Sequence, residues 1–192
     1  MLENPGAAEA DRRIEIARRS GTAHLDLSWL HLDVIPDSLG QLSQLQTLFL
    51  FHNHDITAIP DSLAHLTQLR YLELSDNRIT AIPDSLGQLS QLQFLNLADN
   101  QITDMPESLA TLENLSHLLL HGNPNLGIPP EVLGPRSPDQ RPKPPKEILA
   151  YYFAQRSGSK PLNEAKLILV GPWWRRQDLL GEDAHDRQIQ AG

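Results

Sequence analysis

Aliphatic residues recur in the middle of the chain at spacings that repeat every 23 residues. The segment LRYLELSDNRITAIPDSLGQLSQ (69–91) is followed by LQFLNLADNQITDMPESLATLEN (92–114). Related segments cover 22–44, 45–68, which carries one extra residue, and the degraded 115–133. A repeat of about 20 to 50 residues is typical of proteins built from stacked, similar units. The pattern therefore predicts five such units.

Each unit follows the pattern LxxLxLxxNxIxxIPxxLxxL. The last two leucines of LxxLxL alternate with polar residues, as in a short strand with one buried face. The Asn-x-Ile-x-x-Ile-Pro that follows turns the chain, because proline cannot continue a ladder of hydrogen bonds. One coil alone has nothing to pack against, so its stability depends on its neighbours. We therefore expect short parallel strands that stack into an open, curved sheet.

This pattern resembles the leucine-rich repeat family over residues 22–133. The resemblance implies an α/β fold class, a leucine-rich-repeat solenoid with short helical or 3-10 turns on the convex side of the sheet. Open solenoid ends expose apolar interior and must be covered. We expect an N-terminal cap helix over residues 7–20, with Ile14, Ile16 and Ala17 toward the repeats, and a helix after the repeats. The arginines of the cap helix are expected to be solvated, with contact to a partner as the alternative.

An asparagine occupies one equivalent position in four of the five units: Asn53, Asn77, Asn100 and Asn123. The resemblance implies that these side chains form a buried amide ladder that satisfies backbone groups in the turns. A buried amide that lacks partners costs about 1–3 kcal/mol. A row that reads a sugar or a nucleotide is the weaker alternative. The first unit has Leu30 at this position, which leaves the geometry of its turn open.

The residues between the strand leucines point away from the core and line the concave face. They include several aromatic side chains and an acidic rim, which is typical of a protein-binding surface. We expect a protein or peptide ligand, of basic character, anchored by aromatic rings; packing of these rings only against one another is the alternative. The candidate partner-binding residues are Trp29, Phe49, Phe51, His52, Tyr71, Glu73, Asp76, Phe94, Asn96, Asp99, His117 and His121, with Phe49, Phe51, Tyr71 and Phe94 as the anchors.

Charge and composition narrow the range of partners. The net charge is −8, and residues 22–134 hold thirteen Asp or Glu against only Arg70 and Arg78. This balance disfavours nucleic acid and membrane surfaces as partners. The chain has no cysteine, which excludes disulfides and thiolate chemistry. No apolar run reaches the roughly 18 residues of a membrane span, and we expect a cytoplasmic protein.

The repeats carry no nucleophile motif, paired-carboxylate signature or complete glycine loop, so we expect no catalytic residue, no cofactor and no enzyme activity. Eight histidines raise the question of a metal, and the nearest pairs are His52 with His54 and His117 with His121. Neither pair has a carboxylate at ligand spacing, so no metal site is predicted. The oligomeric state and the identity of the ligand stay open.

The chain changes character after the repeats. Residues 135–145 are rich in proline and are expected to form a semi-rigid linker. KEILAYYFAQRSGS (146–159) is typical of a short amphipathic helix, and PLNEAKLILVG (161–171) contains an apolar strand over 165–170. This order resembles the Roco family, in which leucine-rich repeats precede a Ras-like GTPase domain called Roc. The resemblance implies that residues 146–171 are a connector helix and the first strand of a Roc domain.

In a Roc domain this strand leads into a phosphate loop that binds GTP with Mg²⁺. The loop has the form GxxxxGK[ST], because backbone N–H groups wrap the phosphates and the lysine neutralises them. Gly171 matches the first glycine, but PWWRRQDLL (172–180) supplies neither the second glycine nor the lysine. The sequence therefore predicts that only a remnant of the phosphate loop is present.

The genetic code suggests why the loop is incomplete. Tryptophan has the single codon TGG, so reading Trp173 and Trp174 one base later gives glycine twice. The codons that follow permit GPGGAGKTSL, a complete phosphate loop. We interpret residues 172–192 as a disordered, out-of-frame tail, with a genuine basic-aromatic contact motif as the alternative. The chain is then a non-catalytic fragment of a Roco-type GTPase; the alternative is a GTP-hydrolysing enzyme, which describes the parent protein.

Overall fold

The computed structural model describes residues 4–136 and 140–157. The chain divides into two units, Met1–Phe153 and Ala154–Gly192, and the first contains all five repeats. The strand expected over 165–170, Gly171 and the tail 172–192 lie outside the described residues. Within the described part of the chain, no helix is long and apolar enough to span a membrane.

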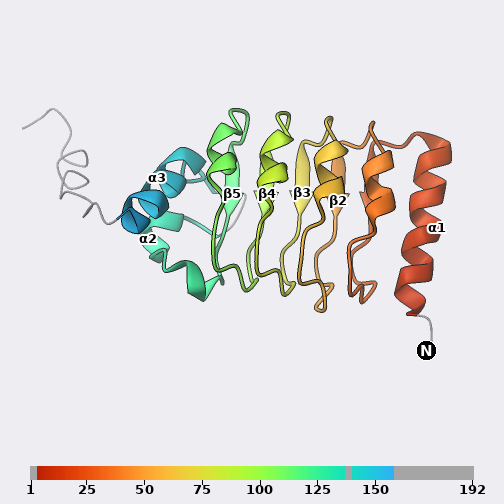
Figure 1. The fold of residues 1–192 in the computed structure, drawn as a ribbon, viewed down its shortest axis with the longest axis horizontal. Coiled ribbons are helices and arrows are strands. Elements are labelled where there is room, and N and C mark those ends of the chain that lie inside the picture. Colours follow the sequence, from red (N-terminus) through yellow and green to blue (C-terminus); the bar gives the residue numbers. More distant parts are fainter. Residues whose placement is uncertain (1–3, 137–139, 158–192) are drawn as a thin grey trace, which may run out of the picture. The chain divides into compact units, whose positions relative to one another are not determined.

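The repeats form one parallel sheet, whose five strands follow one another in chain order (Figure 1). Neighbouring strands pair at the same position of the repeat, so that Leu25 lies opposite Leu48 and Leu48 opposite Leu72. The extra residue of the second unit lies after Asn53 and leaves this register intact. The strands are β1 (His24–Asp26), β2 (Thr47–Phe49), β3 (Tyr71–Glu73), β4 (Phe94–Asn96) and β5 (His117–Leu119).

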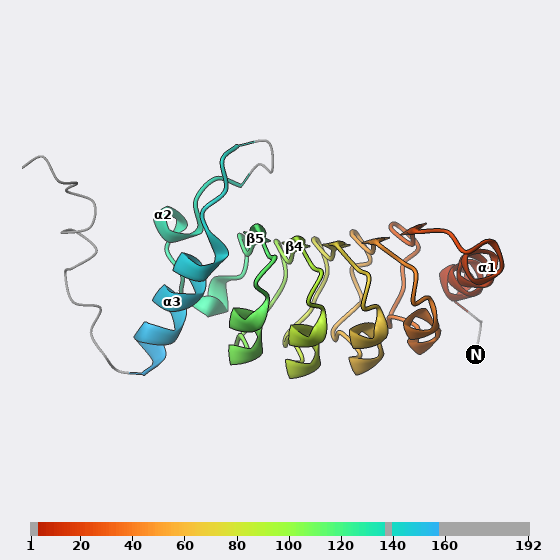
Figure 2. The ribbon, with the colours of Figure 1, turned by 90° about the horizontal axis from the view of Figure 1, so that it is seen from above.

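A short 3-10 helix lies on the opposite side of each coil from its strand (Figure 2). Each of the first four helices begins directly after a proline in an extended conformation. The proline ring fixes the backbone angle φ at this point, and its lack of an N–H ends the ladder of hydrogen bonds there. The helices are η1 (Asp37–Gln41), η2 (Asp61–His65), η3 (Asp84–Gln88), η4 (Glu107–Thr111) and the shorter η5 (Pro124–Leu126). The predicted fold class, a leucine-rich-repeat solenoid with a helix at each end, is confirmed.

The core is a single column of side chains, mainly leucine and isoleucine, that runs through all five coils. In the third coil, Leu72, Leu74 and Ile79 are completely buried. Burying one such side chain stabilises the fold by roughly 1.5–3 kcal/mol. Each coil buries its apolar side chains against the coils before and after it. The first and last coils each lack one neighbour, so another element must cover their apolar side chains.

Helix α1 (Pro5–Ser20) closes the N-terminal end. Asn4 caps it by accepting a hydrogen bond from the Gly6 N–H at 2.9 Å, and it ends at Gly21 in the left-handed conformation (φ 66°). Its buried side chains are Ala10, Ile14 and Ala17. The expectation that Ile16 faces the repeats is wrong, because Ile16 is 52% exposed.

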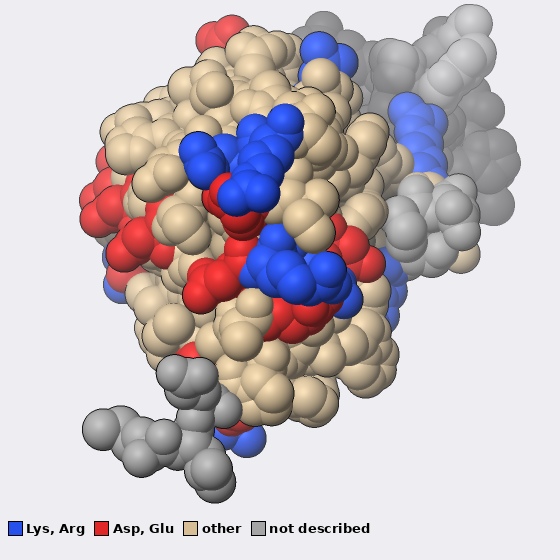
Figure 3. Space-filling model, turned by 90° about the vertical axis from the view of Figure 1, so that its right-hand side faces the viewer, with Lys and Arg blue, Asp and Glu red and all other residues tan. Residues whose placement is uncertain are grey.

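The outer side of α1 carries two clusters of ion pairs (Figure 3). Glu9 accepts hydrogen bonds from Arg12 and Arg13, and these bonds lower the pKa of Glu9 to about 2. Glu15 pairs in the same way with the two arginines of the next turn, which lower the pKa of Glu15 to about 2. The four arginines therefore pair with glutamates of their own helix, and this end of the molecule is not a purely basic patch.

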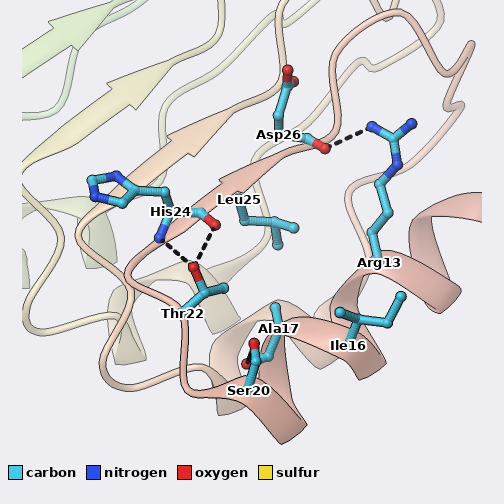
Figure 4. A pocket seen from close by; sticks show the side chains of 8 residues that line it. All are labelled: Arg13, Ile16, Ala17, Ser20, Thr22, His24, Leu25 and Asp26. Carbon is cyan, nitrogen blue, oxygen red and sulfur yellow. Dashed lines mark hydrogen bonds between the residues drawn. The ribbon is translucent and has the colours of Figure 1, made fainter.

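The free edge of β1 is occupied by side-chain hydrogen bonds beside a shallow pocket (Figure 4). The Thr22 hydroxyl accepts from the His24 N–H at 3.3 Å and donates to the His24 carbonyl at 3.2 Å. Arg13 donates to the Asp26 carbonyl at 2.9 Å. An unpaired strand edge is a template for another strand. These contacts occupy much of that template, so strand addition at β1 is disfavoured.

Two helices follow the repeats, α2 (Pro130–Leu133) and α3 (Pro145–Arg156). Ile148, Leu149 and Tyr152 of α3 are buried in the same core as the repeats. The Tyr152 hydroxyl donates to Asp104 Oδ1 at 2.7 Å and accepts from the Met105 N–H at 3.2 Å. Within the first unit, α3 thus closes the C-terminal end of the column.

The repeated asparagines are buried, and each bonds to its own coil and to the coil before it. Asn77 Oδ1 accepts from the Asn53 N–H at 3.1 Å. Asn77 Nδ2 donates to the Leu50 carbonyl of the preceding coil at 3.1 Å and to the Leu74 carbonyl of its own coil at 2.9 Å. Asn100 and Asn123 repeat this arrangement and accept from the N–H groups of Ile79 and Ile102, one coil earlier.

This direction of bonding explains the first coil, which has Leu30 in place of asparagine. The N–H groups of Leu30 and Leu32 both donate to Asn53 Oδ1, at 3.1 and 3.0 Å. An asparagine at position 30 would form hydrogen bonds with a preceding coil. No coil precedes the first one in this fold, because helix α1 occupies that place. Gly6 of α1 packs so closely that an added Cβ would lie 1.6 Å from the Leu30 carbonyl oxygen. The turn also differs in having two left-handed residues, Trp29 (φ 62°) and His31 (φ 54°).

We predict that Asn77→Ala lowers the free energy of unfolding by on the order of 3 kcal/mol, because it leaves several buried backbone groups without partners. The matched control is Asn125→Ala, at an exposed position, which should change it by less than about 0.5 kcal/mol. Urea denaturation followed by circular dichroism measures both. Equal effects of the two substitutions would contradict the structural role of Asn77.

Candidate ligand-binding face

The exposed side of the sheet and the turns that follow the strands form one surface, which we call the strand face. Each coil contributes two strand residues and two turn residues to it. All the predicted partner-binding residues lie on this surface. From the first coil to the fifth, it is formed by His24, Asp26, Ser28 and Trp29; Thr47, Phe49, Phe51 and His52; Tyr71, Glu73, Ser75 and Asp76; Phe94, Asn96, Ala98 and Asp99; and His117, Leu119, His121 and Gly122.

Aromatic side chains form a continuous chain of contacts along the strand face. The rings of Trp29 and His52 stack with their centroids 3.9 Å apart, and Phe51 meets the Trp29 ring edge-on at 6.4 Å. Phe49 contacts Phe51 at 6.4 Å and Tyr71 at 5.6 Å. Edge-on and stacked pairs at these distances are mutually attractive. The rings are therefore held in place before any ligand arrives.

The expectation that Phe94 is exposed to a ligand is wrong, because its ring is only 7% exposed. It stacks on Tyr71 at 4.0 Å, with the ring planes 4° apart, and contacts His117 at 5.7 Å on the other side. Adjacent strands lie about 4.8 Å apart, so rings at equivalent positions can stack on one another. Burial, aided by the charge of Glu73, raises the pKa of Tyr71. At these strands the rings pack against one another.

Among the Trp, Phe and Tyr residues of the strand face, Trp29 is the exposed one, at 59%, whereas Phe49, Phe51 and Tyr71 are half-buried and Phe94 is buried. Trp29 is also in the left-handed conformation, with φ 62°. The equivalent residue of every other coil is left-handed too, and we call these five positions the left-handed row. The row consists of Trp29 (φ 62°), His52 (φ 56°), Asp76 (φ 55°), Asp99 (φ 54°) and Gly122 (φ 73°).

The left-handed conformation suits glycine, asparagine and aspartate and is strained for a bulky side chain. The third, fourth and fifth coils follow this preference, with Asp76, Asp99 and Gly122. Trp29 departs from it, and the Trp29 ring lies largely in solvent rather than in the core. Strain at a residue whose side chain stays largely exposed marks a candidate functional residue.

Several polar residues of the strand face are fixed by the turns. Glu73 Oε1 accepts from the Ser75 N–H at 3.0 Å, and Glu73 Oε2 accepts from Asn96 Nδ2 at 3.0 Å. Asn96 Oδ1 accepts in turn from the Ala98 N–H at 3.0 Å. Such local bonds replace backbone partners that the turn lacks. Glu73 and Asn96 thus hold the turns, and the Glu73 carboxylate is held beside the Tyr71 ring.

The fourth and fifth coils are partly covered by the segment that follows α2. Arg136 makes an ion pair with Asp99, and a ring nitrogen of His121 is hydrogen bonded to the Gly134 carbonyl at 3.0 Å. Figure 2 shows the described residues between α2 and α3, 134–136 and 140–144, on the strand side of the sheet near β5. The sequence predicts a linker at Arg136 and not this contact, because a periodic pattern carries no information on a contact between residues 37 apart outside the repeat.

The histidine pairs do not build a metal site. The His52 and His54 rings are 5.5 Å apart, His52 lies 3.7 Å from the Asp76 carboxylate, and His121 is engaged with Gly134. Among the described residues, no group of three or more metal-ligating side chains is close enough to hold an ion.

The repeat pattern matches two family models, "Leucine rich repeat" over residues 20–79 and "Leucine-rich repeat region" over residues 61–134. Residues 20–134 are a leucine-rich repeat region. Such regions are commonly modules for binding proteins or peptides. A comparison with curated proteins gives no match.

Solved structures with similar leucine-rich repeats come from plants and bacteria. One is the ectodomain of the Arabidopsis thaliana receptor kinase GASSHO1/SCHENGEN3 in complex with CASPARIAN STRIP INTEGRITY FACTOR 2, at 37% identity over 46% of this chain and 11% of that one (TM-score 0.44). The plant peptide hormone receptor RGFR1 in complex with RGF2 is 38% identical over 47% of this chain and 15% of that one (TM-score 0.45). A Leptospira interrogans leucine-rich repeat protein is 29% identical over 57% and 34% (TM-score 0.44). This chain thus spans about a third or less of each of these proteins.

The strain at Trp29 can be measured by comparing two substitutions that both remove the ring. Trp29→Gly should be more stable than Trp29→Ala by roughly 1 kcal/mol, because only glycine adopts the left-handed conformation without cost. The midpoint of urea unfolding for the two variants gives the difference. If Trp29→Ala is as stable as Trp29→Gly, the backbone at this position is not strained.

Proposed function

We propose that this leucine-rich repeat region binds a basic peptide or protein segment on the part of the strand face formed by the first three coils. The observation that carries the proposal is Trp29, a 59% exposed tryptophan in a conformation that tryptophan disfavours. Large exposed aromatic side chains are the commonest anchors of protein interfaces. The fold has no evident need for a tryptophan at this position.

The charge around Trp29 supports a basic ligand. The first three coils contribute the carboxylates of Asp26, Glu73 and Asp76 to the strand face, and none of their face positions is Lys or Arg. A cation that approaches these carboxylates also meets the rings of Trp29 and Phe51, and cation–π contacts are favourable by about 0.5–2 kcal/mol. Acidic surroundings further raise the association rate of a basic partner.

Side chains of the strand face in the first three coils are already held in fixed positions, and this favours tight binding even by a small surface. The Trp29 ring is stacked on His52, and the Glu73 carboxylate is tied to the Ser75 N–H, so few side chains need to become ordered on binding. Each side chain that must be immobilised costs about 0.5–1.5 kcal/mol of affinity. The strand face in the first three coils therefore offers fixed rings and fixed carboxylates side by side.

A random-peptide display library tests this proposal. We expect the selected peptides to be rich in Arg and Lys and to bind Trp29→Ala at least about tenfold more weakly than the unmodified protein. Val34→Ala is the matched control, because Val34 is an exposed apolar residue (65%) between β1 and η1, outside the strand face. Selected peptides that are acidic, or that bind both variants equally well, would overturn the proposal.

We also propose that the chain derives from a Roco-type protein, in which a Roc GTPase domain follows the repeats. The support is the sequence PLNEAKLILVG and the phosphate loop that its following codons permit in the shifted frame. GTP and Mg²⁺ belong to that parent protein. Residues 171–180 of this chain do not fit them, because they lack the second glycine and the lysine of a phosphate loop.

The coding DNA tests this origin directly. From codon 173 onward, read one base later, it should spell Gly-Gly-Ala-Gly-Lys-Thr, and the shifted frame should continue beyond the stop codon as a Roc domain. Codons that do not spell this motif would contradict the origin. A GTP titration of the chain by calorimetry should show no binding, and measurable affinity would support the GTPase alternative.

A further inference from the structure

The contact between Arg136 and Asp99 links the segment after the repeats to the candidate ligand-binding face. Arg136 is the first basic residue after Arg78 in the sequence, and it meets a carboxylate of the left-handed row. Two residues earlier, the Gly134 carbonyl is hydrogen bonded to His121 in the fifth coil. The segment Gly134–Arg136 therefore lies on the strand face as a short basic peptide.

The Asp99 carboxylate has room for this contact because the next coil has glycine at the equivalent position. A Cβ added at Gly122 would lie 2.2 Å from Asp99 Oδ1 and 2.9 Å from Asp99 Cα. The other carboxylate oxygen, Oδ2, is the one that meets Arg136. The main chain supports the site, since the Asp99 N–H donates to the His121 carbonyl at 2.7 Å. Asp99, His121 and Gly122 thus form a small, shaped receptor.

The contact is also weak enough to exchange. The Arg136 side chain is 63% exposed and the Asp99 side chain 33% exposed. Ion pairs between exposed groups contribute about 0–1 kcal/mol, because water screens them. Arg136 occupies the site because the chain keeps it nearby at a high effective concentration. An arginine from another molecule with additional contacts can therefore replace it.

We propose that Asp99, His121 and Gly122 form an arginine-binding subsite of the strand face, which Arg136 fills from the same chain. This inference rests on the proposed function and adds a specific feature of the ligand. A ligand that occupies the whole face presents an arginine to Asp99, displaces Arg136, and presents a backbone carbonyl to His121 where the Gly134 carbonyl now lies.

The spacing of the coils sets the spacing of the ligand residues. Trp29 lies in the first coil and Asp99 in the fourth, three strand spacings away. At about 4.8 Å per strand this is roughly 14 Å, which an extended peptide covers in about four residues. The ligand that fits best thus carries an aromatic or apolar residue and an arginine about four positions apart.

The tripeptide acetyl-Gly-Pro-Arg-amide, which copies residues 134–136, tests the subsite in the full-length chain. We compare its binding to the unmodified protein and to Arg136→Gln by NMR, using the imidazole signals of His121 and the indole signal of Trp29. We expect the variant to bind the tripeptide roughly two- to fivefold more tightly, because the competing arginine, held by about 0–1 kcal/mol, is gone. The His121 signals should shift and the Trp29 signal should not.

Two controls identify the group that is recognised. Replacing arginine in the tripeptide by citrulline, its neutral counterpart, should abolish binding. Asp99→Asn in the Arg136→Gln background should also abolish it, and asparagine keeps the left-handed conformation accessible. Equal affinity with and without Arg136, binding of the citrulline peptide, or binding to the Asp99→Asn variant would overturn the subsite. Because the readout is His121 and not Trp29, these results do not depend on whether the aromatic end of the face binds peptides.

Discussion

The buried asparagine amides are the interaction on which the rest of the structure depends. Each amide bonds to the turn of its own coil and to the turn of the coil before it, so the amides connect neighbouring turns through a buried column. The leucine column provides most of the apolar burial, but apolar contacts are non-directional and do not fix how one coil is oriented on the next. The amides fix where each turn lies; the residue before each asparagine is left-handed, and so is Trp29, which precedes Leu30 in the first coil.

This left-handed row gives the binding face its form. The left-handed residues project from one side of the sheet at equal intervals, and their identities change from aromatic in the first coil to acidic in the third and fourth. A scaffold that needed only stability would use glycine, asparagine or aspartate at all five positions. Trp29 instead places a bulky ring there, stacked on His52, at a cost in stability, which is a common relation between a functional site and its scaffold.

The spacing of leucine, asparagine and proline was enough to predict the strands, the turns and the set of residues on the face, because these depend on the period of the repeat. Exposure within the face was not predictable in this way. Phe94 is buried because Tyr71 and His117 lie on either side of it, whereas Trp29 is exposed because it begins the row. The contact of Arg136 with Asp99 depends on the path of a nonrepetitive segment, which no period encodes. The resemblance to the Roco family rests on residues beyond the repeats and stays a proposal.

The most direct test of the central claim, that each asparagine holds the coil before its own, is amide hydrogen exchange in Asn123→Ala. Ile102 in the fourth coil donates its N–H to Asn123, and Ile79 in the third donates to Asn100. We expect exchange at the Ile102 N–H to accelerate at least about tenfold, while the Ile79 N–H keeps its protection. Unchanged exchange at Ile102, with loss of protection only within the fifth coil, would contradict the account.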